Sequence, residues 1–229
     1  MKQRLGITII LLALVTSACT TASFGHRDRN LDPDERLDAL VAAYQESRGG
    51  RDANDSHLLA DAGRQAAEIE QLALEFPRHT RTLQANAVIA YENKDHAKTQ
   101  RYLSALFAVE PSYPEAAILR SRVAIDEGNL PLARRQLEAQ VDYTPNHAGV
   151  REAFSSVLYM SGDLEGAVRE IAVAEKLGAP AWRVAFNRGL LAEAAGRPAD
   201  AQRFYRAALD ANPGFEAAQA RLEGAKAGS

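Results

Sequence analysis

The sequence predicts an all-α protein in which helical hairpins stack into an α-solenoid, and three observations support this prediction. Prolines recur at intervals of 34 residues or twice that: Pro77, Pro111, Pro145 and Pro213. Glycines keep the same interval: Gly128, Gly162 and Gly196. Apolar residues follow a helical spacing between these breakers. Because two residue types share one period over more than four repeats, we expect one structural unit of 34 residues to recur along the chain.

Each period is expected to hold two helices separated by the glycine. In the last period the first helix is predicted over 181–195 and the second over 199–211, with a Gly-Arg-Pro break at 196–198. A glycine suits the residue after a helix, where a left-handed conformation excludes most side chains, and a proline suits a first helical turn. Asn129 and Asp163 are predicted to cap second helices of earlier periods, because their side chains accept hydrogen bonds from free backbone N–H groups.

The hairpins resemble the tetratricopeptide repeat (TPR), a 34-residue motif with a small residue on its first helix, alanine and an aromatic residue on its second, and a closing proline. The last period carries this pattern most completely: Gly189, Gly196, Ala201, Tyr205, Ala208 and Pro213. Earlier second helices place Ala133 and Leu137, or Ala167, Ile171 and Ala174, at the corresponding positions. In the period that ends at Pro111, Lys94 replaces the glycine and Thr99 the alanine. The resemblance covers residues 78–213 as four TPR units and implies a right-handed TPR array.

The chain on either side of these units is expected to be helical as well. Residues 34–77 are predicted to form a divergent first hairpin, with helices over 33–47 and 56–76. Residues 214–229 are predicted to form a capping helix and a tail, because apolar residues recur there at helical spacing with charged residues between them. Such a helix covers the last apolar face of a solenoid.

Residues 1–18 are typical of a secretory signal peptide, with a basic start, eleven apolar residues and small residues before Cys19. Eleven apolar residues are too few to span a bilayer, which argues against a transmembrane helix. The run that ends in Cys19 resembles a bacterial lipobox, which implies lipidation of this cysteine; a buried or incidental thiol is the alternative. Residues 19–33 are predicted to form a lipidated tether. In lipoproteins with this motif, a residue other than aspartate directly after the cysteine favours the outer membrane. Because Thr20 follows Cys19, the resemblance implies the periplasmic face of the outer membrane.

Composition and motifs argue against nucleic-acid binding and against cofactor or metal chemistry. The formal net charge is −3, so no basic surface for nucleic acid is indicated. The single cysteine and five histidines show no metal-binding spacing, and no Walker loop, dinucleotide fingerprint or nucleophile elbow occurs. We therefore expect no cofactor, no metal, no small-molecule substrate and no enzymatic activity. His79, His96 and His147 fall at or near predicted turns and are expected to be solvated loop residues.

In TPR arrays the first helices line a concave groove, so the resemblance implies a partner-binding surface on these helices. The residues that map to inward positions are apolar and charged: Arg81, Gln84, Val88, Tyr91, Glu92, Glu115, Ile118, Arg122, Ile125, Glu152, Ser156, Tyr159, Met160, Arg183, Phe186, Leu190 and Glu193. Core packing between hairpins is the alternative role for Tyr91, Tyr159 and Phe186. The lysine and asparagine clamp that some TPR domains use for a C-terminal carboxylate is not matched here.

Two classes of function stay open at this point. The first is a lipid-anchored periplasmic scaffold or adaptor whose groove binds a protein or peptide of the envelope. TPR lipoproteins that assist pilus or secretion-system assembly, or cell-wall enzymes, are similar to such a protein. The second class is a subunit of an envelope hydrolase or chaperone complex with an active site that the sequence does not reveal. A buried polar constellation in a pocket would favour the second class.

Overall fold

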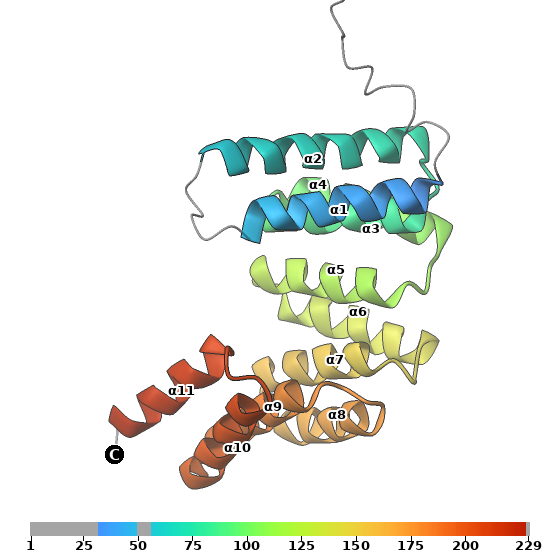
Figure 1. Cartoon of the computed structure of the whole chain (residues 1–229). Helices are drawn as coiled ribbons and strands as arrows, with labels where there is room; N and C mark the ends of the chain where they lie inside the picture. Colours follow the sequence, from blue (N-terminus) through green and yellow to red (C-terminus); the bar gives the residue numbers. More distant parts are fainter. Residues whose placement is uncertain (1–31, 50–55, 228–229) are drawn as a thin grey trace, which may run out of the picture.

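The computed structural model describes residues 32–49 and 56–227, and within these ranges it contains α-helices and no β-strand (Figure 1). The helices are α1 (Pro33–Gly49), α2 (Ser56–Glu75), α3 (Thr80–Glu92), α4 (His96–Val109), α5 (Pro114–Asp126), α6 (Leu130–Tyr143), α7 (Ala148–Met160), α8 (Leu164–Lys176), α9 (Ala181–Ala194), α10 (Pro198–Ala211) and α11 (Glu216–Ala227). The predicted signal peptide, Cys19 and most of the tether lie outside the described residues. No helix in the described ranges is both long enough and apolar enough to cross a membrane.

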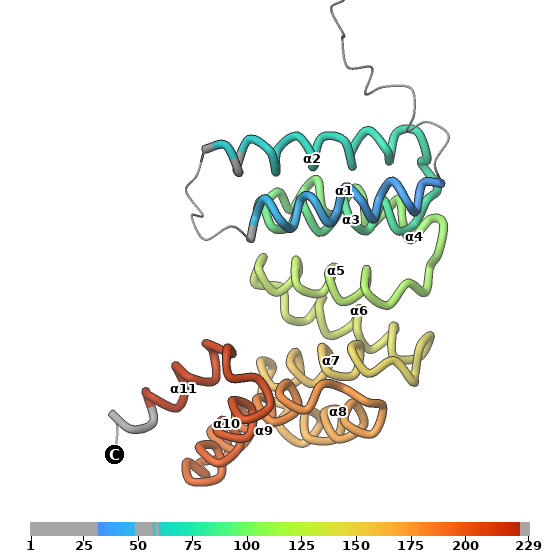
Figure 2. Tube along the Cα trace, in the orientation of Figure 1, coloured from blue at the N-terminus to red at the C-terminus, as the bar shows by residue number. Residues whose placement is uncertain are grey.

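The helices pair into hairpins, from α1–α2 to α9–α10, and α11 follows the last hairpin (Figures 1 and 2). Each hairpin packs on the next, because α2 contacts α3, α4 contacts α5, α6 contacts α7 and α8 contacts α9. The first helices of neighbouring hairpins also contact one another, in the order α1, α3, α5, α7 and α9. The result is an α-solenoid, so the predicted fold class is confirmed.

Small residues close the seam inside each of the last three hairpins. Ala133, Ala167 and Ala201 are all buried on the second helices α6, α8 and α10, with at most 3% of their surface exposed. Small side chains at such positions let two helix backbones approach to about 8–10 Å. In the last hairpin the close approach is visible at Gly189 on α9, where an added Cβ atom would overlap the Tyr205 ring on α10. Glycine is therefore required there by the neighbouring ring.

The turns inside the hairpins use one left-handed residue each. Gly128, Gly162 and Gly196 have φ angles of 74°, 80° and 69°, at the positions that the 34-residue period predicts. Lys94 occupies the same position in the first regular hairpin and takes the same conformation, with φ of 61°. The replacement of glycine by lysine therefore leaves the turn intact at the cost of a strained backbone.

The predicted caps of the second helices are confirmed. The Asn129 side chain accepts a hydrogen bond from the backbone N–H of Leu132 at 3.1 Å, and Asp163 accepts one from Gly166 at 2.9 Å. Pro198 is the first residue of α10, where it lacks an N–H that the helix could not have used. These residues mark where the second helices α6, α8 and α10 start.

The two ends of the solenoid have apolar contacts of their own. Leu37 and Tyr44 of α1 pack with Ile69 and Leu72 of α2, and Ile89 of α3 joins this cluster. At the other end Ala218 of α11 is fully buried and Leu222 packs against the Tyr205 cluster of the last hairpin. The helix α11 therefore covers part of the apolar face of the last hairpin.

Candidate protein-binding groove

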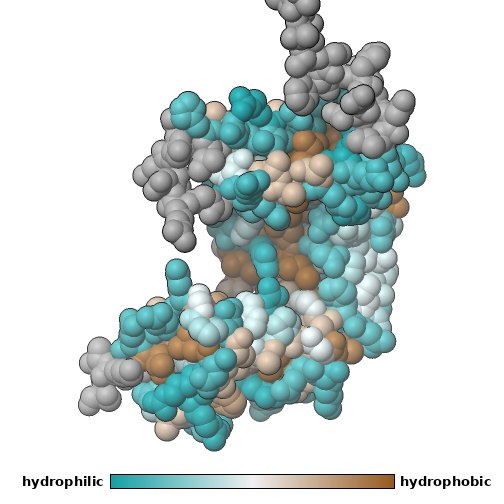
Figure 3. All heavy atoms as spheres, viewed as in Figure 1, coloured by the Kyte–Doolittle hydropathy of each residue, from teal (hydrophilic) through white to brown (hydrophobic). Residues whose placement is uncertain are grey.

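The residues predicted for the groove all lie on the first helices α3, α5, α7 and α9, and none of them is fully buried. Eight are exposed: Arg81, Val88, Glu92, Glu115, Arg122, Met160, Arg183 and Glu193. Nine are half-buried: Gln84, Tyr91, Ile118, Ile125, Glu152, Ser156, Tyr159, Phe186 and Leu190. In the space-filling view hydrophobic surface lines a recess between the upper and lower parts of the molecule (Figure 3). A half-buried apolar surface of this kind is typical of a binding site.

A first hollow of about 270 Å³ lies where α1 crosses α3. Its floor is apolar, with Leu37 and Val41 of α1 beside Ala85 and Val88 of α3. Of these, Val88 is 37% exposed, which is large for an apolar side chain in a recess. The structure brings the predicted residues Arg81, Gln84 and Val88 together here.

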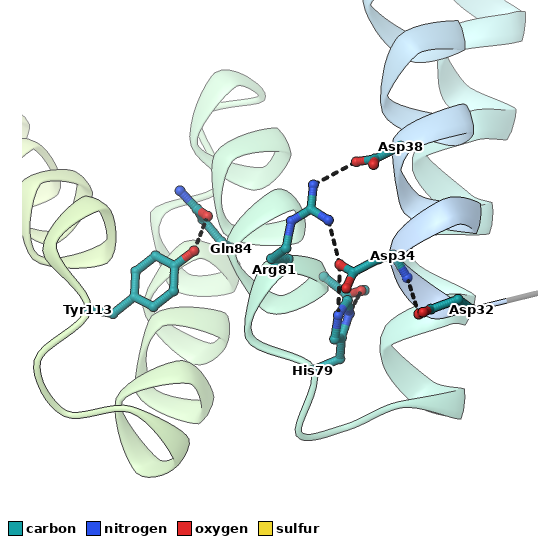
Figure 4. Close-up of polar contacts among 8 residues, drawn as sticks. Asp32, Asp34, Asp38, His79, Arg81, Gln84 and Tyr113 are labelled. Atoms are coloured by element: carbon teal, nitrogen blue, oxygen red, sulfur yellow. Dashed lines mark hydrogen bonds and ion pairs between the residues drawn. The ribbon is translucent and has the colours of Figure 1, made fainter.

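The rim of the first hollow carries more acidic than basic groups. Arg81 of α3 forms ion pairs with Asp34 and Asp38 of α1, the second at 2.6 Å (Figure 4). The hydrogen bond from Arg81 holds the pKa of the Asp34 carboxyl below its usual range. At the other end of the hollow the Tyr44 hydroxyl donates to the Glu92 carboxylate at 3.0 Å. Asp38 and Glu92 line the hollow together with Arg81, and Asp34 also pairs with Arg81, so carboxylates outnumber guanidinium groups at this end of the groove.

A second hollow of about 240 Å³ lies between α5, α7 and α9. Arg122 and Arg183 line it from α5 and α9, on either side of Glu152 on α7. The Arg183 guanidinium lies 3.5 Å from the Glu152 carboxylate, and burial raises the pKa of Glu152 although Arg183 opposes this shift. Arg122 has no carboxylate within 4 Å in the part of the chain that the structure describes. Two arginines against one half-buried carboxylate make this hollow positive.

The sequence left two roles open for three aromatic residues, partner binding and core packing, and all three have packing contacts. Tyr91 stacks on His96 with ring centroids 6.0 Å apart, and Tyr159 packs against the core cluster of the middle hairpins. Phe186 meets Phe215 edge to face at 4.9 Å, in the segment that leads into α11. Each of the three residues is half-buried, so each contributes to packing and keeps some exposed surface.

Several predicted residues lie outside both hollows. Phe186 and Glu193 line a wider hollow of about 760 Å³ between α9, α10 and α11, where Arg221 bonds to Glu193 at 3.1 Å. The remaining predicted residues lie on the first helices and line none of these three hollows: Tyr91, Glu115, Tyr159, Met160 and Leu190. The predicted set is therefore divided: most of its members line one of three hollows, and five line none.

Sequence reasoning missed the residues that α1 adds to the groove. Asp38, Val41 and Gln45 line the first hollow, although α1 was treated only as part of a divergent hairpin. The signal that could have found them is the spacing of Asp34 and Asp38, which lie four residues apart on one helix face beside an apolar stripe. The Gln84 amide oxygen, in turn, accepts a hydrogen bond from Tyr113 at 2.7 Å, which positions it between two hairpins (Figure 4).

The histidines correct one expectation from the sequence. The His147 Nδ1 atom accepts a hydrogen bond from the Val150 N–H at 3.2 Å, and its Nε2 atom lies 3.2 Å from Glu115. His79 lies 2.6 Å from the Thr82 hydroxyl and 3.2 Å from Asp34. The expectation of solvated loop residues was wrong, because both histidines precede a first helix and turn back onto it.

The groups in the hollows suit non-covalent recognition. Among the described residues no three His, Cys, Asp or Glu side chains are placed to hold a metal ion. The polar groups that line the two groove hollows are mainly arginines, carboxylates and amides above apolar floors. Such a mixture can hold an extended segment by hydrogen bonds, ion pairs and apolar contact.

Comparison of this chain with solved structures identifies its fold. The chain has the fold of TPR proteins. It is similar to TTC0263, a TPR protein of Thermus thermophilus, with a TM-score of 0.67 and 17% identity over 85% of this chain and 98% of that one. It is also similar to PilW, a type IV pilus biogenesis factor, with a TM-score of 0.64 and 12% identity over 78% of this chain and 77% of that one.

A third similar structure is YrrB, a TPR protein with an unusual peptide-binding site, with a TM-score of 0.52 and 14% identity over 82% of this chain and 99% of that one. No protein-family model matches the sequence, and no curated protein matches it. At these identities the comparisons establish the TPR fold of the chain.

Proposed function

We propose that this protein is a non-enzymatic scaffold that binds an extended segment of a partner protein along the groove of its first helices. The observation that carries the proposal is the pair of hollows along one face, each with an apolar floor and a charged rim. YrrB, which shares the fold, has a peptide-binding site. The pair of hollows therefore suits a segment whose side chains alternate between apolar and charged groups.

We further propose that the scaffold is a lipoprotein held at the periplasmic face of the outer membrane. The support is the sequence of residues 1–19, with its signal-like segment and its lipobox-like end at Cys19. The fold is shared with PilW, a pilus biogenesis factor, which favours a role in pilus or secretion-system assembly. If the scaffold instead assists cell-wall enzymes, such an enzyme would bind in the same groove.

Site-specific crosslinking tests the groove. A photoreactive residue at Val88 lies in the first hollow and is 37% exposed, whereas one at Val168 lies on the second helix α8 and is 50% exposed. We expect the Val88 position to crosslink to a partner in living cells and the more exposed Val168 position not to do so. Crosslinks from Val168 alone would overturn the groove as the binding surface.

A separate experiment tests the anchor. We expect the mature protein to begin at Cys19, to carry lipid and to fractionate with membranes, as intact-mass analysis and fractionation would show. The Cys19→Ala variant should release the folded array into the soluble fraction. A soluble wild-type protein that is cleaved elsewhere would disprove the anchor while leaving the groove untouched.

A further inference from the structure

A fourth hollow, of about 370 Å³, lies between α4, α5 and α6, on the side of α5 that faces away from the groove. Arg120 lines it from α5. Residues two apart on a helix differ by about 200° in direction, so Arg120 lies opposite its neighbours Ile118 and Arg122, which line the groove. The hollow and the groove are therefore separate sites on opposite sides of one helix.

The residues that line this hollow give it a positive charge. Arg120 and Arg135 line it, and none of its lining residues is acidic. Neither arginine has a carboxylate within 4 Å among residues 32–49 and 56–227. By contrast, Arg134 and Arg151 nearby pair with Asp163 and Glu170, at 3.2 and 2.9 Å. The two arginines of the hollow are thus available to an anion from outside the chain.

Two polar atoms in the same hollow are buried without a hydrogen-bond partner in the described structure, the Arg120 Nε and the Gln136 Oε1. Most buried polar groups in proteins have a partner, so two orphans in one place need an explanation. The first atom is a donor that lacks an acceptor, and the second is an acceptor that lacks a donor. A peptide can supply both, because it carries carbonyl or carboxylate oxygens and an N–H group.

Two side chains that line the hollow have contacts within the protein. The Arg120 guanidinium carbon lies 5.4 Å from the centroid of the Phe107 ring, a cation–π contact. Gln140 donates from Nε2 to the Ser112 carbonyl at 3.0 Å, which ties α6 to the turn before α5. Tyr143, at the rim, is 67% exposed and offers an apolar face to a neighbouring residue of the ligand.

We propose that this hollow is a second binding site, which takes an acidic side chain of a partner protein together with the apolar residue beside it. The guanidinium groups of Arg120 and Arg135 bind the carboxylate, and Phe107 and Tyr143 contact the apolar residue. Because the site lies on the opposite side from the groove, the scaffold can hold two segments at the same time. The inference does not depend on what the groove binds.

Fluorescence anisotropy with the full-length protein in detergent tests this site. The probes are two labelled peptides of sequence Leu-Glu-Leu and Leu-Gln-Leu with blocked ends. We expect the Glu peptide to bind at least about tenfold more tightly, and the Arg135→Gln variant to lose that advantage. Arg135 is exposed, so this variant should melt at the wild-type temperature in circular dichroism.

Two matched variants keep the test specific. Arg206→Gln makes the same charge change on α10, where Arg206 bonds only weakly to Gln202 at 3.4 Å, and Arg122→Gln makes it in the groove. Arg206→Gln should bind the Glu peptide within about twofold of wild type, and Arg135→Gln should lose the advantage of the Glu peptide equally in the Arg122→Gln background. An equal loss in Arg206→Gln would show non-specific charge attraction, and a loss in Arg122→Gln alone would show binding in the groove. Displacement of the peptide by an equal concentration of inorganic phosphate would show a simple anion site. Each of these three results would overturn the proposal.

Discussion

Small buried residues close the seams inside the last three hairpins, whereas the side chains predicted to line the groove are half-buried or exposed. Ala133, Ala167 and Ala201 expose at most 3% of their surface, while Val88 and Met160 expose 37% and 41%. The seams must repeat every 34 residues because each hairpin packs on the next in the same way. The groove is under no such constraint, so its residues are free to differ between repeats and to carry specificity.

The largest effect is expected at a seam. Ala201→Glu places an unpaired carboxylate in the contact between α9 and α10, where overpacking alone costs about 1–3 kcal/mol and the buried charge adds to it. The melting temperature and the helical signal should fall together. Ala199→Glu makes the same change two residues earlier at an exposed position and should alter the stability by less than about 0.5 kcal/mol. Equal melting temperatures for the two variants would mean that the repeat phase is wrong.

A second seam prediction contrasts two glycines in helices. Gly189→Ala adds a Cβ that would overlap the Tyr205 ring, so the ring must move and the hydrogen bond from Tyr205 to Glu193 must weaken. We expect a loss of stability of about 1–3 kcal/mol. Gly63→Ala in α2 meets nothing within 4 Å and should raise the stability by up to about 1 kcal/mol, because alanine favours the helix. Chemical denaturation should give shifts of opposite sign. Shifts of the same sign would contradict the close packing at Gly189.

The groove prediction concerns binding rather than folding. Arg122→Ala removes an exposed guanidinium from the second hollow and should weaken a captured partner by about tenfold or more, with an unchanged melt. Tyr159→Ala should weaken binding by a similar factor and also lower the melting temperature, because this ring packs against the middle core. Val168→Ala on α8 is the control and should change neither property. If both groove variants bind normally while changes on the second helices abolish binding, the groove is not the partner site.

The regular features of the fold could be predicted from the sequence because each has a local cause. Gly128 and Gly162 mark left-handed turns, and Asn129 and Asp163 mark helix starts, whatever lies elsewhere in the chain. The hollows could not be predicted in this way, since they depend on side chains from several helices. The first hollow needs Asp38 of α1 beside Arg81 of α3, 43 residues further on. No period of the sequence relates these two residues.

The pH dependence of stability tests how deeply the groove carboxylate is buried. Because burial raises the pKa of Glu152, the folded chain holds this proton more tightly than the unfolded chain does. The stability that this residue contributes is therefore present at low pH and is lost as the pH rises through its folded pKa. In thermal melts, Glu152→Gln should gain stability relative to wild type as the pH is raised from the acidic to the neutral range. Glu138→Gln, an exposed carboxylate on α6, serves as the control. A relative loss with rising pH would show that the ion pair with Arg183 outweighs burial.

The smallest effect is expected at the one described hairpin turn that departs from the glycine pattern. Lys94 has φ of 61°, a conformation that costs a residue with a Cβ about 1–2 kcal/mol, and part of this cost should be recovered in Lys94→Gly. Two effects offset part of this gain. Glycine increases the conformational entropy of the unfolded chain, and the variant lacks the Lys94 ammonium that lies 5.6 Å from the centroid of the Tyr91 ring. We expect a net stabilisation of about 0.5 kcal/mol in chemical denaturation. Lys94→Ala keeps the Cβ and should show no gain, whereas Gly162→Ala should lose about 1 kcal/mol at the equivalent turn. If Lys94→Gly is no more stable than Lys94→Ala, then the left-handed backbone at this turn costs the protein nothing.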